Sequence, residues 1–228
     1  MILTTEHRAL FCLLRAGLWE REIDDLSPFP LTEAEWKNVH RMALRQTVTG
    51  IVFRGLDYLP EDLLPNDMLM MRWVASVDSI EQRNQKMNTV LGSLQQVMAQ
   101  NDLHPVLLKG QGVAAFYEYP LLRECGDIDL YFSSEKEERK AAELMRQAGH
   151  LVERHADGSN NYSWEGIEIE HHTQLFDLYN PLLKGFLSKL IKKHGFSNRQ
   201  IDENLSVSVP SPMLNLLALN SHLLKHMM

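Results

Sequence analysis

The sequence has little cysteine and lacks any long uninterrupted hydrophobic run. Its two cysteines, Cys12 and Cys125, are far apart and lie in unlike contexts, which excludes a disulfide framework and indicates free thiols in a reducing cytosol. No segment approaches the roughly 20 apolar residues that span a bilayer. The apolar N-terminal run is interrupted by Glu6 and Arg15, and no small-residue cleavage site follows it. We therefore expect a cytoplasmic protein with no membrane partner.

Positive charge is also scarce. Lysine and arginine number 23 against 30 aspartate and glutamate residues, giving a net charge of −7 and a pI of about 5.8. This balance excludes a general nucleic-acid coat and leaves room only for a local basic groove. The 228 residues, 44% of them hydrophobic, suffice for a core in one or two domains.

Residues 1–101 show helical patterns only, and we predict an N-terminal helical region there. Thr32 and Glu35 form a capping-box pattern that opens one helix. The residues that follow helical spacing behind it are Trp36, Val39, Ala43, Thr47, Val48, Ile51 and Val52. A long helix follows two prolines, and Asn101 is its expected stop.

The pattern changes at His104, and residues 102–178 predict a mixed α+β core. A short apolar run at 105–108 indicates a buried strand. A short helix at 112–119, a second strand at 128–132 and a helix opened by Ser134 and Glu137 follow. Three further strands are expected at 151–155, 161–164 and 167–173.

Residues 179–228 return to a helical pattern, and we predict a C-terminal helical region. It comprises a basic amphipathic helix at 182–194, a short strand at 206–209, and a last helix from residue 211 or 212. That last helix reaches Met228 without a stop signal, so we expect the natural helical region to be longer than this chain.

The candidate chemistry centres on Asp127 and Asp129, which flank Ile128 in a predicted strand. Side chains alternate along a strand, so both carboxylates point to one face, roughly 6 to 7 Å apart. Two carboxylates placed in this way repel each other unless a cation lies between them. Mg²⁺ meets this need, because it takes oxygen ligands from a few carboxylates and from substrate phosphates.

A third carboxylate is expected from the strand at 167–173. Alternation places Glu168, Glu170 and His172 on one face of it. We favour Glu170 as a metal ligand or as the base that deprotonates an acceptor hydroxyl, with Glu168 as the alternative. His172 is expected to contact the ligands or the substrate, with a structural role as the alternative.

A phosphate-binding turn is expected where the first core strand ends. Gly110 permits close approach of a triphosphate, and the helix that follows offers free N–H groups. Lys109 and Arg123 are the cations best placed in sequence to meet phosphate charge. Each feature alone has a structural explanation, but their combined order favours a nucleotide and metal site.

These residues together resemble a known family. The segments Leu107-Leu108-Lys109-Gly110 and Gly126-Asp127-Ile128-Asp129-Leu130, with Arg83-Asn84 before them and Glu170-His171-His172 after them, resemble the uncharacterised nucleotidyltransferase family of the DNA polymerase beta-like superfamily. The resemblance implies a small mixed sheet with flanking helices. It also implies catalytic and metal-binding roles for Asp127, Asp129 and Glu170, and a phosphate-loop role for Gly110.

The implied activity is Mg²⁺-dependent transfer of a nucleotide monophosphate from a nucleoside triphosphate to a hydroxyl acceptor, with release of pyrophosphate. Mn²⁺ is the alternative metal, and ATP is among the candidate donors. The acceptor stays open between a small molecule, an RNA end and a protein. Because Lys109-Gly110 replaces the superfamily's usual Gly-Ser or Gly-Gly, an inactive nucleotide- or partner-binding module is the alternative function. Phosphohydrolase chemistry at the same carboxylates is a third reading.

Overall fold

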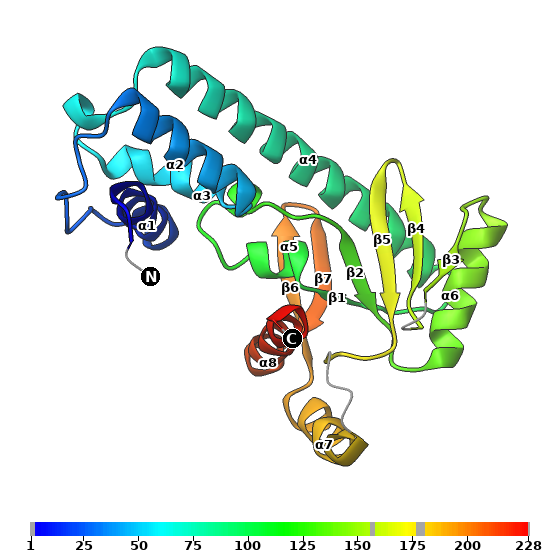
Figure 1. Cartoon of the computed structure of the whole chain (residues 1–228). Helices are drawn as coiled ribbons and strands as arrows, with labels where there is room; N and C mark the ends of the chain where they lie inside the picture. The colour runs from blue at the N-terminus through cyan, green and yellow to red at the C-terminus, as the bar shows by residue number, and fades with distance from the viewer. Residues whose placement is uncertain (1–2, 156–157, 177–180, 228) are drawn as a thin grey trace. The chain divides into compact units, whose positions relative to one another are not determined.

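A computed structural model describes residues 3–155, 158–176 and 181–227 of the chain. These residues form two compact units (Figure 1). The first contains Met1–Gln85 and Tyr117–Glu124, and the second contains Lys86–Phe116 and Cys125–Met228. The helix α4 (Asp67–Ala99) has residues in both units. The three regions predicted from the sequence, 1–101, 102–178 and 179–228, were divided by secondary-structure pattern and not by compactness. This division stays a prediction.

The first unit is helical. It contains α1 (Thr5–Trp19), α2 (Glu33–Arg45), α3 (Thr49–Arg54), the start of α4, and the short 3-10 turns η1 (Gly55–Tyr58), η2 (Glu61–Leu63) and η3 (Pro120–Leu122). The predicted capping box is confirmed, because the Glu35 N–H donates to Thr32 Oγ1 and the Thr32 N–H donates to Glu35 Oε2. The helical stripe from Trp36 to Val52 is interrupted, since Thr47 adopts a left-handed φ of 52° between α2 and α3.

Aromatic side chains fill the core of the first unit. Trp73 of α4 is fully buried and makes ring contacts with Trp36, His40 and Phe53. Burying an indole of this size is among the largest single hydrophobic contributions to a core. The first part of α4 is therefore held by the helices that precede it in the chain.

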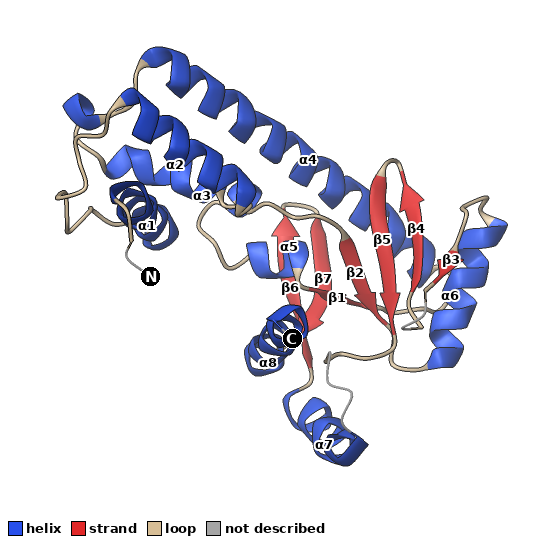
Figure 2. Ribbon diagram, in the orientation of Figure 1, coloured by secondary structure: helices blue, strands red, loops and turns tan. Residues whose placement is uncertain are grey.

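The second unit is built on a five-stranded mixed sheet (Figure 2) in the order β1-β2-β5-β4-β3. These strands are β1 (Val106–Leu108), β2 (Ile128–Tyr131), β3 (Glu153–Arg154), β4 (Asn160–Trp164) and β5 (Ile167–His172). β2 and β5 pair in parallel, and the other neighbours pair antiparallel. The predicted strands and the α+β class are confirmed, as is the small mixed sheet with flanking helices.

Of the two helices that connect the core strands, the first differs from the prediction and the second agrees with it. The helix after β1 is α5 (Gly110–Ala114), so the predicted helix at 112–119 begins earlier and ends sooner. Residues 117–124 instead belong to the first unit. The helix α6 (Glu135–Gln147) follows β2 as expected, with Ser134 Oγ accepting the Glu137 N–H.

The C-terminal part contains strands as well as helices. The turn η4 (Pro181–Leu183) leads into α7 (Lys184–His194). The hairpin of β6 (Phe196–Asp202) and β7 (Leu205–Pro210) follows, and the helix α8 (Pro212–Met227) ends the described chain. The short strand expected at 206–209 is confirmed, but its partner β6 was not predicted, because its mostly exposed polar residues carry no buried alternation. Among the described helices, none is long and apolar enough to cross a bilayer.

Candidate functional site

The parallel pairing of β2 and β5 brings two acidic residues together. In this register Asp129 is the direct partner of Glu170, and Ile128 is the partner of Ile169. Neighbouring strands lie about 4.8 Å apart, and paired residues project to the same face of the sheet. The apolar partners therefore face the core, while the two carboxylates share the opposite face.

The alternation predicted for β5 is confirmed. Ile167, Ile169 and His171 are buried, whereas Glu168 is exposed and Glu170 and His172 are partly buried. Glu168 pairs across from Ser163 on β4 and lies two residues away from the Asp129 position. Of the two glutamates considered, Glu170 is the one that the register places beside Asp129.

Asp129, Glu170 and His172 form a compact group of potential metal ligands. One ligand atom from each lies within 4.8 Å of the others. His172 Nε2 lies 2.8 Å from Asp129 Oδ1 and 3.4 Å from Glu170 Oε2. Within the described residues this is the one such group that the structure contains, and its three side chains come from two adjacent strands.

Lys109 supplies a second positive charge to the same carboxylate. Its Nζ lies 3.4 Å from Asp129 Oδ1, and the Asp129 side chain is only 3% exposed. Lys109 has a left-handed φ of 48°, which is uncommon for a residue with a side chain. Such a backbone conformation persists only where the surrounding structure holds it. The predicted phosphate contact of Lys109 is untested, and in this state the ammonium group pairs with the carboxylate.

The pKa shifts of the group follow from these contacts. Burial raises the pKa of Asp129, but the hydrogen bond from His172 and the charge of Lys109 together outweigh it and lower that pKa. The hydrogen bond from His172 likewise lowers the pKa of Glu170. For His172, burial lowers the pKa, but the two carboxylates outweigh burial and raise it to about 9. The imidazole is therefore cationic near neutral pH.

Asp127 differs from these carboxylates. It lies directly before β2 and is partly buried. Burial raises its pKa, and the negative charge of Asp129 raises it further, while Lys109 opposes the shift. The positive charge near Asp127 is therefore too small to offset its burial and its acidic neighbours. This is the electrostatic environment expected of a metal-binding carboxylate in the metal-free protein.

The turn between β1 and α5 lies against Asp127. Gly110 has a φ of 32°, and a Cβ built on it would lie 3.4 Å from the Asp127 carbonyl oxygen. A side chain at this position would be strained by the backbone conformation, while its Cβ would be in ordinary van der Waals contact with that oxygen. The glycine therefore allows the predicted phosphate turn to lie close to the residue that opens the acidic strand.

Arg123 belongs to the first unit and not to the unit that contains the carboxylates. Its Nη1 donates to the Glu124 carbonyl oxygen at 3.4 Å, and its own carbonyl oxygen accepts from Asn84 Nδ2. The phosphate contact expected of Arg123 stays a prediction.

Sequence reasoning missed a buried polar network on the opposite face of β5. His171 Nε2 lies 3.1 Å from the Tyr162 hydroxyl, and His171 Nδ1 lies 3.6 Å from Glu138 Oε1. Asn160 Nδ2 donates to the same Glu138 oxygen at 2.6 Å. The sequence did contain a signal for it. Strand alternation places His171 on the same buried face as Ile167 and Ile169, and a buried polar side chain needs hydrogen-bond partners.

One of three comparisons with known proteins identifies a family. Neither the curated proteins nor the solved structures yield a match to the chain. The model of one family, described as uncharacterised nucleotidyltransferase, matches residues 32–228, a range that includes every candidate residue named above. Since that range is most of the chain, the protein belongs to the uncharacterised nucleotidyltransferase family.

Proposed function

We propose that this protein is a divalent-metal-dependent nucleotidyltransferase that moves a nucleotide monophosphate from a nucleoside triphosphate to a hydroxyl acceptor and releases pyrophosphate. The observation that carries the proposal is the pairing of Asp129 with Glu170 across β2 and β5, with Asp127 two residues before Asp129. Family membership supports the same reaction class.

The donor set fits a hard divalent cation. Asp127, Asp129 and Glu170 offer carboxylate oxygens, which are the ligands that Mg²⁺ and Mn²⁺ prefer. Two cationic side chains, Lys109 and His172, already balance Asp129 and Glu170. A buried carboxylate needs such compensation, and a bound metal ion would take over part of it. In the metal-free protein His172 is a charge partner of both carboxylates, and its imidazole would become a metal ligand only after losing its proton.

Each residue then has a defined task in the proposed reaction. Asp127, Asp129 and Glu170 would hold the cation. As an alternative to this ligand role, Glu170 would act as the base that takes the proton from the attacking hydroxyl. A divalent cation held there would bind triphosphate oxygens and offset the charge that develops on the transferred group. Lys109 and His172, once relieved of part of their carboxylate contacts, would face the phosphates as point charges.

Calorimetric titration tests the proposal. The four nucleoside triphosphates, ATP first, are titrated into wild-type protein with Mg²⁺, with Mn²⁺ and with EDTA. The same titration is made with the double variant Asp127→Asn/Asp129→Asn, and with Glu168→Gln as the matched control. We expect metal-dependent binding of one or more triphosphates that the double variant loses and the control keeps. Unchanged binding in the double variant would contradict the assignment.

A second function has one observation in its favour. Lys109 replaces the small residue of the usual phosphate turn, adopts a left-handed φ, and pairs with Asp129. A site neutralised by its own side chains would suit a module that binds a nucleotide or partner without turnover. Release of labelled pyrophosphate over a pool of hydroxyl acceptors separates the two functions, and release of inorganic phosphate would instead indicate hydrolysis.

A further inference from the structure

A small pocket opens beside the acidic group in the second unit. Lys109 and His172, which both contact Asp129, are partly exposed members of its lining. Its buried members are Leu108, Leu175, Asn215 and Ala218. All of these residues belong to the second unit. The pocket therefore leads from the two cations of the candidate site into the interior of one compact unit.

The buried walls of the pocket come from two layers of the fold. Leu108 ends β1 and Leu175 follows β5, so one wall belongs to the sheet. Asn215 and Ala218 lie three residues apart on one face of α8 and form the other wall. The apolar residues of both walls belong to one hydrophobic cluster. The pocket is thus a gap between the sheet and α8 within a packed core.

Asn215 is the polar member of this buried lining. It is 7% exposed, and its neighbours on the same part of α8, Leu214 and Ala218, are buried and apolar. Within the part of the chain that the structure describes, no hydrogen bond joins its carboxamide to another residue. Burying an amide without a partner costs stability, and asparagine is also a poor helix former. Packing alone therefore does not explain Asn215.

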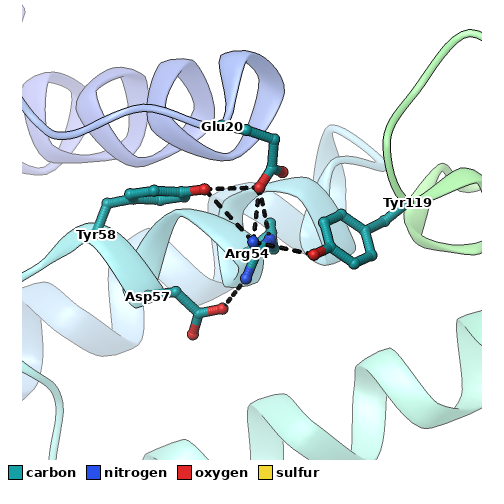
Figure 3. A network of polar contacts seen from close by, with 5 residues as sticks. All are labelled: Glu20, Arg54, Asp57, Tyr58 and Tyr119. Carbon is teal, nitrogen blue, oxygen red and sulfur yellow. Dashed lines mark hydrogen bonds and ion pairs between the residues drawn. The ribbon is translucent and has the colours of Figure 1, made fainter.

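Arg54 of the first unit shows how the chain itself can satisfy a largely buried polar group (Figure 3). Its guanidinium group donates to the side chains of Glu20, Asp57, Tyr58 and Tyr119. The described chain offers no such partner to the Asn215 carboxamide. A bound molecule that enters the pocket would complete its hydrogen bonds.

The chemistry of the pocket fits the edge of a nucleobase. A carboxamide carries a donor and an acceptor side by side, and asparagine pairs in this way with the amino group and a ring nitrogen of adenine. The apolar residues Leu108, Leu175 and Ala218 suit the flat face of a ring. The closed part of the pocket has room for a group about as large as one water molecule. The amino group of adenine is of this size, so the base would enter by its edge.

We propose that this pocket is the base subsite of the nucleotide donor, that Asn215 is its specificity-determining residue, and that ATP is the donor it selects. The inference rests on the proposed function, in which Lys109 and His172 face the phosphates. These two residues line the pocket and contact Asp129, so a nucleotide whose phosphates meet them has the pocket within reach of its base.

Matched leucine substitutions on α8 test the proposal. Asn215→Leu replaces the carboxamide with an apolar group of similar shape, and Asn220→Leu makes the same change at an exposed position of the same helix. ATP, GTP, CTP, UTP and inorganic tripolyphosphate are titrated with Mn²⁺ into both variants and the wild type by calorimetry. For Asn215→Leu we expect ATP binding weaker by about tenfold or more, with tripolyphosphate binding unchanged. Asn220→Leu should bind all five ligands as the wild type does.

The unfolding temperature of the metal-free protein is a second measurement. Because the Asn215 carboxamide has no partner among the described residues, Asn215→Leu and Asn215→Ala should unfold at the same temperature as the wild type or higher. A lower temperature for both variants would give Asn215 a structural role and overturn the inference. If the leucine is too bulky for the protein to fold, Asn215→Ala decides, since it only removes atoms.

The titrations also separate failure of this inference from failure of the proposed function. Wild-type protein that binds tripolyphosphate as tightly as ATP, or that prefers another triphosphate, would overturn the adenine subsite and leave the proposed function standing. ATP binding by Asn215→Leu equal to that of the wild type would do the same. Wild-type protein that binds neither tripolyphosphate nor any nucleoside triphosphate with Mn²⁺ would contradict the proposed function, and the inference with it.

Discussion

His172 Nε2 lies 2.8 Å from Asp129 Oδ1, so a cationic imidazole contacts a carboxylate oxygen that is itself a candidate metal ligand. The same nitrogen lies 3.4 Å from Glu170 Oε2. One proton on His172 therefore balances two carboxylates. A divalent cation that uses these oxygens has to compete with that proton, which links metal binding to pH.

Metal affinity is predicted to rise with pH. The pKa of His172 is about 9 in the metal-free protein, so at neutral pH metal binding weakens the contacts that keep the imidazole charged. If one proton is released for each metal ion, the apparent Mn²⁺ affinity rises by about tenfold per pH unit up to about pH 9. Calorimetry at pH 6.5, 7.5 and 8.5, in buffers of different ionisation enthalpy, measures both the affinity and the proton count. The variant His172→Gln should show a flatter profile, and an equally steep one would contradict the linkage.

Stability of the metal-free protein should show the opposite trend. The pKa of His172 is raised to about 9 in the folded protein, against about 6.5 unfolded. Its contribution is therefore fully present below pH 6.5 and is lost as the pH rises through 9. The loss is at most about 3 kcal/mol. Urea unfolding in EDTA at pH 6.5 and pH 9.5, with His172→Gln as the comparison, measures it. A difference between the two pH values that is the same in both proteins would assign the loss to other groups.

Local patterns in the sequence predicted the parts of the site that depend on strand phase. The alternation around Ile167 and Ile169 was sufficient to place Glu170 and His172 on one face, because side chains alternate strictly along a strand. Glu170 was favoured over Glu168 from the sequence, but the pairing that sets Glu170 beside Asp129 is the register of β5 against β2, which no local pattern contains. Periodicity reports which face is buried, and pairing is decided by residues far away in the sequence.

Other features were beyond prediction for the same physical reason. Lys109 was expected to meet phosphate, and its pairing with Asp129 depends on the antiparallel register that sets Leu108 opposite Asp129. The polar strand β6 carries no buried alternation and is defined by its hydrogen bonds to β7. The start of residues 117–124 resembled the continuation of a helix. The hydrogen bonds that hold this segment come from Asn84, which is 37 and 39 residues before the two residues that it contacts.

Asp127 and Asp129 are predicted to respond oppositely to neutralisation in the metal-free protein. Asp127 has a raised pKa because burial and its acidic neighbours oppose its charge, so Asp127→Asn should leave the stability unchanged or increase it. Asp129→Asn leaves Lys109 and His172 near a partner without charge, and breaking a buried pair costs roughly 3–5 kcal/mol. Thermal unfolding at pH 7 with EDTA compares the two variants. A larger loss for Asp127→Asn would show that the charge balance is assigned to the wrong carboxylate.

The buried network behind β5 is predicted to stabilise the sheet without taking part in metal binding. Glu138 Oε1 accepts from Asn160 at 2.6 Å and lies 3.6 Å from His171 Nδ1, and these contacts join α6 to β4 and β5. Glu138→Leu leaves the buried Asn160 Nδ2 without its acceptor and removes the carboxylate that lies near His171 Nδ1, so we expect a loss of roughly 1–3 kcal/mol. Urea unfolding at pH 7 measures the loss, and Glu143→Leu, on the exposed side of the same helix, is the control. At temperatures where the Glu138→Leu protein is folded, its Mn²⁺ affinity should equal that of wild type, since the network and the carboxylates lie on opposite faces of the sheet. A weakened affinity in the folded variant would mean that the orientation of Glu170 depends on the buried network, which would then be part of the support for the metal site.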